Sequence, residues 1–348
     1  MFRKVIYLVV ITSLIFIIVG LYLPKTVHVE RSVEIARPAS TVFVLLNGFS
    51  TFSAWSPWSE RDPETVYGYS GPVSGVGARM SWNGDPRLVG SGWQEITASA
   101  PWSRISLQMQ LDQVGKATSY YQIHEAAGGI QLTWGFDMNL VEGQGFFSGL
   151  LVRYFGLFFD RWIGTDFEAG LARFKAYAES FPAADFSKLE AEIVQVEPMD
   201  ILYVTMGRRE SAEGIAAGLA AAFSEISALM ANQSSAMQSQ PMAITRAWDE
   251  ENYAFDAAIP ANTAGVELSG NVRAGKSPGG RAVRVVHKGP YDTMAESYTK
   301  LAAYMAVHGI AEGRVSWEQY VSDPGQTLPG EAVTHIYFLI EDPARDAR

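Results

Sequence analysis

The longest uncharged apolar run of the chain lies at its N-terminus. Residues 5–23 (VIYLVVITSLIFIIVGLYL) contain no charge, and as a helix they rise about 28 Å, close to the ~30 Å hydrocarbon core of a bilayer. Arg3 and Lys4 precede the run and Lys25 follows it. The pattern predicts a single-pass anchor over residues 1–25, N-in, in the inner or cytoplasmic membrane with the domains outside the cytoplasm. Since no A-x-A-like site follows, an anchor is favoured over the alternative, a cleaved signal peptide.

The next part of the chain predicts strand, helix, many strands and a long helix. Apolar and polar residues alternate over 26–35, and a short helix is expected over 38–46, with proline near its first turn. Gly- and Trp-rich alternation over 55–140 predicts several antiparallel strands. An apolar helix follows over 146–179. Its segment 149–159 is too short to span a bilayer, so it is either a core helix or a membrane-touching lid over a cavity.

The C-terminal part contains an internal repeat, after a linker around Phe181-Pro182. Each copy predicts strand, helix, strand, strand, so that one sheet carries helices on one face. Gly289 is expected to supply a special backbone conformation, Thr293 and Glu296 a capping box, and Gly309 a helix C-cap. The strands and helices of the first copy are expected at 200–206, 215–229, 242–248 and 253–259, and those of the second at 282–287, 294–305, 315–321 and 334–340. The fold class is therefore α+β.

Composition limits the partners. The 348 residues suit two domains, and 48% hydrophobic residues with 18% charged ones are typical of packed globular structure. The net charge is −10, without a cluster of Lys and Arg, so nucleic acid is not an expected partner. No cysteine is present, which excludes disulfides, thiolate metal sites and Cys nucleophiles.

Residues 26–182 resemble the START-like (SRPBCC, polyketide-cyclase-like) superfamily. The resemblance implies a helix-grip fold, in which a curved antiparallel sheet wraps on a long C-terminal helix with a hydrophobic cavity between them. The pieces that carry it are Val29-Glu-Arg-Ser-Val-Glu-Ile, Pro38-Ala-Ser-Thr-Val-Phe, Trp55-Ser-Pro-Trp58, Gly75-Val-Gly-Ala, Trp82-Asn-Gly and the helix Gly164–Glu179.

Residues 190–345 look like the GyrI-like effector-binding fold. The matching pieces are His287-Lys-Gly-Pro-Tyr291, Trp317-Glu-Gln-Tyr320, Asp323-Pro324 and Thr334-His-Ile-Tyr-Phe-Leu. The family binds small molecules, often hydrophobic cations, and often follows a DNA-binding helix-turn-helix. Here an anchor and a START-like domain take the place of that DNA-binding domain, which argues against a transcriptional role.

Glu318 is the first candidate binding residue. In a strand it shares one face with Tyr320, while Trp317 points to the other. Aligning the two copies by Asp249 and Asp323 places Ile244 at the equivalent position, to within one residue, so the scaffold itself does not require a carboxylate there. The resemblance places the matching Glu at the centre of the ligand pocket, where a cationic ligand would offset its burial. The alternative is a solvated Glu on an exposed face.

Other candidates are aromatic. Tyr320, Tyr291 and Trp317 lie near Glu318 in the sequence, and Trp248, Tyr253 and Phe255 of the first copy are candidates for the other side of the pocket. His287 is expected to be structural. In the START-like part, six tryptophans are candidates for core or cavity wall: Trp55, Trp58, Trp82, Trp93, Trp102 and Trp134.

No catalytic set is recognisable in the sequence. The five histidines have no metal-binding spacing, and neither a G-x-S-x-G elbow nor a phosphate-binding loop is present. We therefore expect no metal and no cofactor. The sequence favours a membrane-anchored binding protein for hydrophobic, amphiphilic or cationic small molecules, held around Glu318, with the START-like cavity as a second candidate site. The alternatives are a hydrolase or cyclase with Glu318 as general acid or base, and a ligand-free envelope scaffold.

Overall fold

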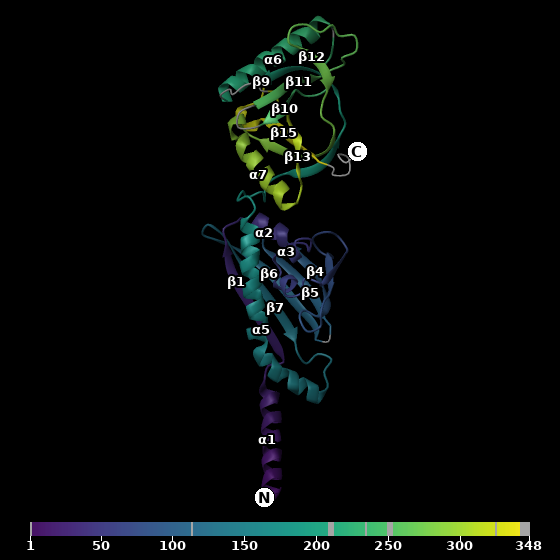
Figure 1. Ribbon diagram of the computed structural model, residues 1–348. Coiled ribbons are helices and arrows are strands. Elements are labelled where there is room, and N and C mark those ends of the chain that lie inside the picture. Colours follow the sequence, from purple (N-terminus) through teal and green to yellow (C-terminus); the bar gives the residue numbers. More distant parts are fainter. Residues whose placement is uncertain are drawn as a thin grey trace. The chain divides into compact units, whose positions relative to one another are not determined.

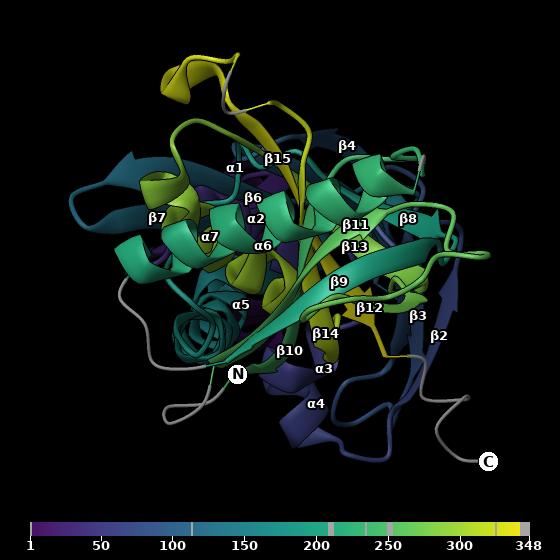
Figure 2. The ribbon, with the colours of Figure 1, turned by 90° about the horizontal axis from the view of Figure 1, so that it is seen from above.

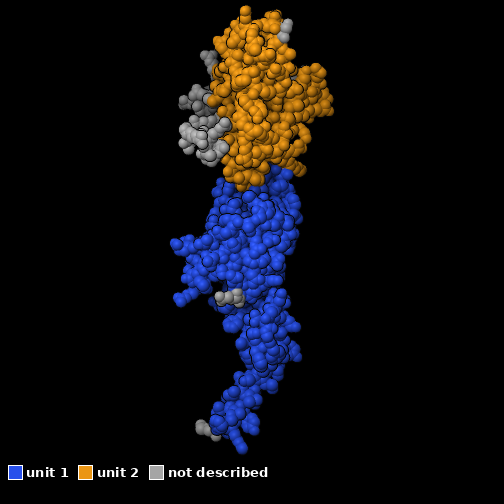
Figure 3. Space-filling view, turned by 90° about the vertical axis from the view of Figure 1, so that its right-hand side faces the viewer, with its two compact units in different colours: residues 1–187 blue, residues 188–348 orange. Residues whose placement is uncertain are grey.

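The computed structural model separates the chain into two compact units, residues 1–187 and 188–348 (Figure 3). Each unit is described by itself. The residues that the structure describes are 2–112, 114–207, 212–233, 235–248, 253–323 and 326–341.

The first unit begins with helix α1 (Phe2–Tyr22) and continues as one antiparallel sheet with helices (Figure 1). The sheet order is β1-β7-β6-β5-β4-β3-β2. Its strands are β1 (Thr26–Ile35), β2 (Val66–Ser70), β3 (Arg79–Asn83), β4 (Ser91–Ala100), β5 (Arg104–Leu111), β6 (Gly115–Ala126) and β7 (Gly129–Asn139). Its other helices are α2 (Ala39–Leu46), α3 (Phe52–Trp55), α4 (Pro57–Arg61) and α5 (Phe146–Glu179).

The order strand, helices, strands, long helix is the order that the sequence pattern predicts. The first strand returns to the last, since β1 pairs with β7 from Thr26↔Asn139 to Ile35↔Ile130. Gly128 and Gly129 make the turn before β7 with positive φ angles, which L side chains rarely adopt. Helix α5 packs against β1, α2 and α3 and contributes the fully buried Phe174 to the core.

The second unit is an eight-stranded antiparallel sheet in the order β12-β9-β11-β10-β14-β15-β13-β8. Its strands are β8 (Ala191–Val196), β9 (Asp200–Gly207), β10 (Met242–Trp248), β11 (Tyr253–Pro260), β12 (Arg273–Lys276), β13 (Gly280–Lys288), β14 (Glu312–Tyr320) and β15 (Val333–Ile340). Its helices are α6 (Ala212–Asn232), α7 (Met294–Val307) and the short 3₁₀ helices η1 (Tyr291–Thr293) and η2 (Pro329–Glu331).

The repeat predicted from the sequence is visible in this order. The runs β9-α6-β10-β11 and β13-α7-β14-β15 have the same succession of elements, and β10 and β14 join them by pairing antiparallel. Helix α6 packs on β9 and β11 (Figure 2), and α7 packs on β13. The α7 cluster includes Leu301 and Met305 with Val283 and Ile336. The sequence did not predict β8 and β12, which extend the two outer edges.

The local signals around α7 have mixed outcomes. Gly289 and Gly309 adopt φ angles of 137° and 64°, as expected. The predicted capping box is wrong. The hydroxyl of Thr293 donates to Pro290 O (2.7 Å) and makes no cap hydrogen bond to the helix, because the helix is entered through the 3₁₀ turn. His287 is buried and structural, with Nδ1 2.9 Å from Ser297 Oγ and Nε2 3.2 Å from Pro290 O.

Within the part of the chain that the structure describes, two helices are long and apolar enough to cross a membrane by composition: Phe2–Tyr22 and Gly214–Asn232. The second is the core helix α6, whose Ile226 and Leu229 are buried against β9 and β11. Helix α1 is different, since nearly all its large apolar side chains are exposed. The length and composition of α1 fit either a signal anchor or a signal sequence.

Candidate functional site

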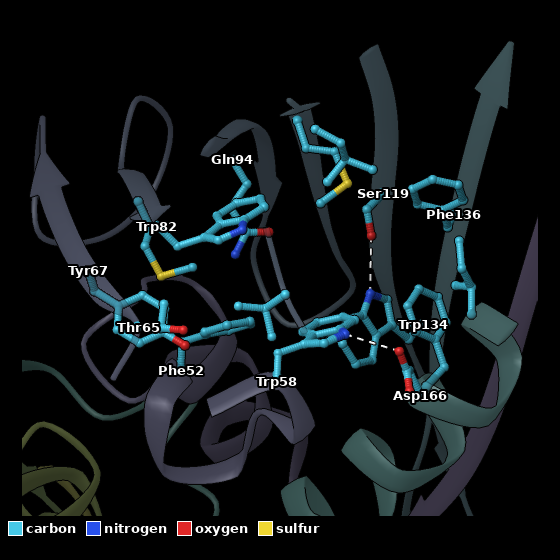
Figure 4. A pocket seen from close by; sticks show the side chains of 16 residues that line it. Phe52, Trp58, Thr65, Tyr67, Trp82, Gln94, Ser119, Trp134, Phe136 and Asp166 are labelled. Carbon is cyan, nitrogen blue, oxygen red and sulfur yellow. Dashed lines mark hydrogen bonds between the residues drawn. The ribbon is translucent and has the colours of Figure 1, made fainter. Parts of the chain in front are cut away.

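The first unit holds a cavity of about 200 Å³ between the sheet and α5 (Figure 4). Its walls are mainly aromatic and apolar, and they come from the helices α3 to α5, from strands β2 to β7 and from the loops between them. The lining residues are Phe52, Trp58, Thr65, Tyr67, Met80, Trp82, Val89, Gln94, Met109, Leu111, Ser119, Trp134, Phe136, Ile163, Asp166 and Phe167. Of the six candidate tryptophans, Trp58, Trp82 and Trp134 therefore line the cavity.

Two polar groups in the wall are already satisfied by the protein. Ser119 Oγ donates to Gly135 O (2.8 Å) and accepts from Trp134 Nε1 (3.1 Å). Asp166 accepts from Trp58 Nε1 (3.1 Å) and forms an ion pair with Arg61, whose pKa this carboxylate raises. Because its charge is matched, Asp166 does not demand a cation from a ligand.

Gln94 is a further polar residue of the cavity wall. It lies on β4 between Met80 of β3 and Met109 of β5, it is 5% exposed, and its amide points into the cavity (Figure 4). Over the described part of the chain, the Gln94 side chain makes no hydrogen bond. Its amide atoms are not among the fully enclosed side-chain atoms without a partner, so they are accessible from the cavity. A ligand in this cavity would be in reach of a hydrogen bond to Gln94.

In the second unit, Glu318 on β14 is partly buried and held by two phenols. Tyr298 of α7 donates to Oε1 (2.7 Å) and Tyr320 donates to Oε2 (2.8 Å). Neither bond neutralises the charge. Within the described ranges, no Lys, Arg or His lies within 4.0 Å of this carboxylate. The site is therefore an anion fixed in direction by two neutral donors, an arrangement that suits a cationic ligand.

Aromatic rings surround this carboxylate on one side. The ring of Tyr320 meets Tyr291 edge to face at 5.7 Å and Phe223 of α6 at 6.1 Å. Burial, followed by the charge of Glu318, raises the pKa of Tyr320 well above its ordinary value, so its hydroxyl keeps the proton and donates. Burial also raises the pKa of Tyr291. The two hydroxyls that donate to Glu318 belong to Tyr298 and Tyr320. This arrangement favours the binding of a positively charged ligand by the carboxylate over proton transfer.

The structure thus brings Glu318, Tyr320 and Tyr291 together, and it separates Trp317 from them. Trp317 is buried on the other sheet face, stacked on Tyr337 at 4.7 Å, as strand alternation predicts. Ile244 pairs with Trp317 and packs in the same cluster, so it lies on the sheet face opposite Glu318. The equivalent position in the first copy is therefore off Ile244 by an odd number of residues, within the uncertainty of one residue in the sequence alignment.

The remaining candidates come from the first copy of the repeat. Phe255 is buried on β11, in register with Thr245 and Met206. The side chains of Trp248 and Tyr253 lie outside the described residues. The sequence did not single out Tyr298, which binds Glu318, or Phe223, which contacts Tyr320, because an aromatic residue in an apolar helix is most often a core residue. Among the described residues, no group of three or more His, Asp or Glu is placed to hold a metal ion.

These features define the class of protein. One unit is an antiparallel sheet on a long helix that encloses an aromatic cavity, and the other is a duplicated strand–helix–strand–strand sheet. Comparison with protein families agrees: residues 26–179 match the family of polyketide cyclase/dehydrase and lipid transport proteins, and residues 189–341 match the GyrI-like small molecule binding domain. The chain consists of a polyketide cyclase-type (SRPBCC) domain followed by a GyrI-like small-molecule-binding domain.

Solved structures show distant similarity only. The C-terminal domain of EcmrR is 19% identical, with 44% of this chain and 98% of that chain covered and a TM-score of 0.39. A hydrolase from Listeria innocua is 15% identical, with 48% and 98% covered and a TM-score of 0.33. The protein CV1439 from Chromobacterium violaceum is 13% identical, with 45% and 99% covered and a TM-score of 0.32. No curated protein matches the sequence significantly.

Proposed function

We propose that this protein is a membrane-anchored receptor or carrier for hydrophobic or amphiphilic small molecules. Helix α1 is the anchor, with its N-terminus on the cytoplasmic side and both domains outside the cytoplasm. The charge-free run 5–23 supports the anchor, and Arg3 and Lys4 before it support the orientation. The fractionation of the full chain tests it: a soluble mature protein that starts near residue 25 contradicts a retained helix.

The observation that carries the proposal is the cavity of the first unit with the unpartnered Gln94 in its wall. An aromatic cavity of this size accepts apolar groups, and one buried amide adds a single oriented hydrogen-bonding point. The ligand of this domain is then neutral and largely apolar, with one hydroxyl, carbonyl or amide group. The cavity also argues against the scaffold alternative, which requires filled interiors.

Glu318 supports a second ligand type in the GyrI-like domain, a hydrophobic cation. A cation about 4 Å from the carboxylate at an effective dielectric of about 20 gains ~4 kcal/mol. The rings of Tyr320, Tyr291 and Phe223 would contact its apolar groups. Neutral molecules of the same shape gain only the contact with the rings.

The test is a thermal-shift titration of the full chain in detergent with tetraphenylphosphonium, beside the neutral triphenylphosphine oxide. Ligand at 100 times its Kd adds about 2.7 kcal/mol of stability to the binding domain. We expect Glu318→Gln to weaken the cation by about 10²–10³-fold and leave the neutral compound unchanged. The matched control is Glu331→Gln, an exposed carboxylate in η2 of the same domain. Equal effects of both variants, or no shift by the cation, contradict the assignment of Glu318.

A further inference from the structure

The first half of helix α5 carries an exposed apolar stripe that the cavity does not use. At 100° per residue, its five side chains fall within about 80° of the helix circumference, over a length of about 22 Å. Their exposed fractions lie between 49% and 72%. The residues of this stripe are Phe147, Leu151, Phe155, Phe158 and Trp162. Water-exposed aromatic side chains in one line are unusual on a monomeric surface and mark an interaction site.

The part of α5 that carries the stripe contacts α1 (Figure 1). Tyr154 stacks on Phe16 with ring centroids 4.3 Å apart and donates to Phe16 O (2.5 Å). Arg153 donates to Leu21 O (2.9 Å). On the helical wheel, Tyr154 precedes the stripe by about 20°. The exposed surface of α1 therefore continues directly into the stripe.

The depth of these contacts identifies the environment. Phe16 is seven residues before Leu23, the end of the charge-free run, and that distance is about 10 Å along the helix. If α1 spans a bilayer with Leu23 at the edge of the hydrocarbon core, Tyr154 lies about 10 Å inside that core, beside Phe16. The stripe residues nearest to Tyr154, Leu151 and Phe155, then cannot face water. Phe158 and Trp162 lie near the ion pair of Asp160 with Arg31 of β1, beyond the end of α1, where the headgroups are expected. Arg153, which binds the last turn of α1, is placed as an interfacial arginine would be.

Further along α5, the side chains on this face change from large and apolar to small. Beyond Trp162, the exposed residues that continue the stripe are Thr165, Ala169, Ala172 and Ala176. Large apolar residues thus stop at one level, although the face stays exposed. Such a boundary is expected where a helix leaves lipid for water.

We propose that residues 147–162 of α5 lie in the outer leaflet of the membrane, so that the stripe is a second lipid contact beside α1. This inference rests on the anchoring proposed above. It assigns the stripe to lipid acyl chains and not to a second copy of the chain. The helix that walls the cavity through Ile163 and Phe167 is then held at the bilayer surface, where apolar ligands are most concentrated.

The chain contains no cysteine, so single-cysteine labelling tests this directly. Leu151→Cys and Phe158→Cys of the full chain, labelled with an NBD fluorophore, are reconstituted in phosphatidylcholine vesicles with and without nitroxide-labelled lipid. Ala172→Cys and Ala176→Cys are the matched controls on the same face, and Leu14→Cys reports α1. We expect blue-shifted emission and nitroxide quenching at 14, 151 and 158, and water-like emission at 172 and 176.

Each other outcome overturns a distinct statement. Quenching at 14 with water-like emission at 151 and 158 contradicts the stripe and leaves the anchor in place. Water-like emission at 14, 151 and 158 contradicts the anchor as well. Blue-shifted emission at 151 and 158 without lipid quenching indicates a protein-covered stripe, and spin-label distances between copies would then identify a homo-oligomer, which also refutes the proposal.

Discussion

Replacement of Gln94 by leucine should stabilise the first unit and weaken its ligand at the same time. Gln94 is 5% exposed, its neighbours across the sheet are Met80 and Met109, and its amide is unpartnered within the described residues. Leucine is similar in size and carries no polar atom. The variant therefore removes an amide without a protein partner from a largely apolar wall, a gain of at most about 1–3 kcal/mol, without opening a large cavity.

The expected shift in melting temperature is measurable. For a unit of this size, about 1 kcal/mol corresponds to roughly 2–4 °C, so Gln94→Leu should raise the Tm by up to about 12 °C. Tryptophan fluorescence reports this transition, because seven of the nine tryptophans (55, 58, 82, 93, 102, 134 and 162) lie in the first unit and two (248 and 317) in the second.

Ser119→Ala is the matched control in the same cavity. Its hydroxyl makes two hydrogen bonds, to Gly135 O and from Trp134 Nε1, so its loss should destabilise by about 1–3 kcal/mol. Opposite signs for the two variants support a binding role for Gln94. A Gln94→Leu protein that melts below the wild type, by as much as Ser119→Ala does, would refute the reasoning, since Gln94 would then be a structural residue.

Three further predictions concern packing, pH and the Glu318 site. Phe174→Ala should cost about 3–5 kcal/mol in the unfolding of the first unit by denaturant, because Phe174 is fully buried against Trp55; a cost below 1 kcal/mol would contradict that packing. Burial lowers the pKa of His335 below 6.5, so its contribution to stability is complete above about pH 6.5 and is lost as the pH falls through the folded pKa; His335→Gln should flatten this acid-side loss in denaturation curves, and an unchanged slope would contradict it. Tyr298→Phe keeps the ring and removes one bond to Glu318, with an expected loss of about 1–2 kcal/mol in the second unit; no change in chemical denaturation would show the bond to be worthless.

Much of the fold follows from periodicity in the sequence. The predicted helix 146–179 coincides with α5, and the strands 242–248 and 334–340 agree with β10 and β15 to within one residue. These segments are long or strongly periodic, which fixes their type. The edge strands β8 and β12 are short and half-exposed, with weak alternation, so tertiary pairing and not local pattern decides them.

The residues of the candidate site were predictable from the sequence only where they lie on the same strand. Glu318 and Tyr320 are two residues apart on a strand, so alternation alone places them together. Tyr298 reaches them from another element, and a tyrosine in a helical apolar stripe is indistinguishable in sequence from a core residue. Gln94 is a similar case. A glutamine in an alternating strand normally faces solvent, and only the closure of the sheet on α5 turns that face into a cavity wall.

If each domain binds the type of ligand proposed above, the two sites select against each other's ligand. In the first unit, Asp166 is already paired with Arg61, so a cation entering the aromatic cavity would lose its hydration without gaining an unpaired anion. At Glu318 the reverse holds. The carboxylate accepts from two neutral donors, Tyr298 and Tyr320, and no Lys, Arg or His of the described residues lies within 4.0 Å of it. A neutral ligand there would leave the charge uncompensated. A molecule that uses both sites must therefore change charge between them, as an amine does when it takes up a proton, and a permanently charged or permanently neutral molecule should occupy one site alone.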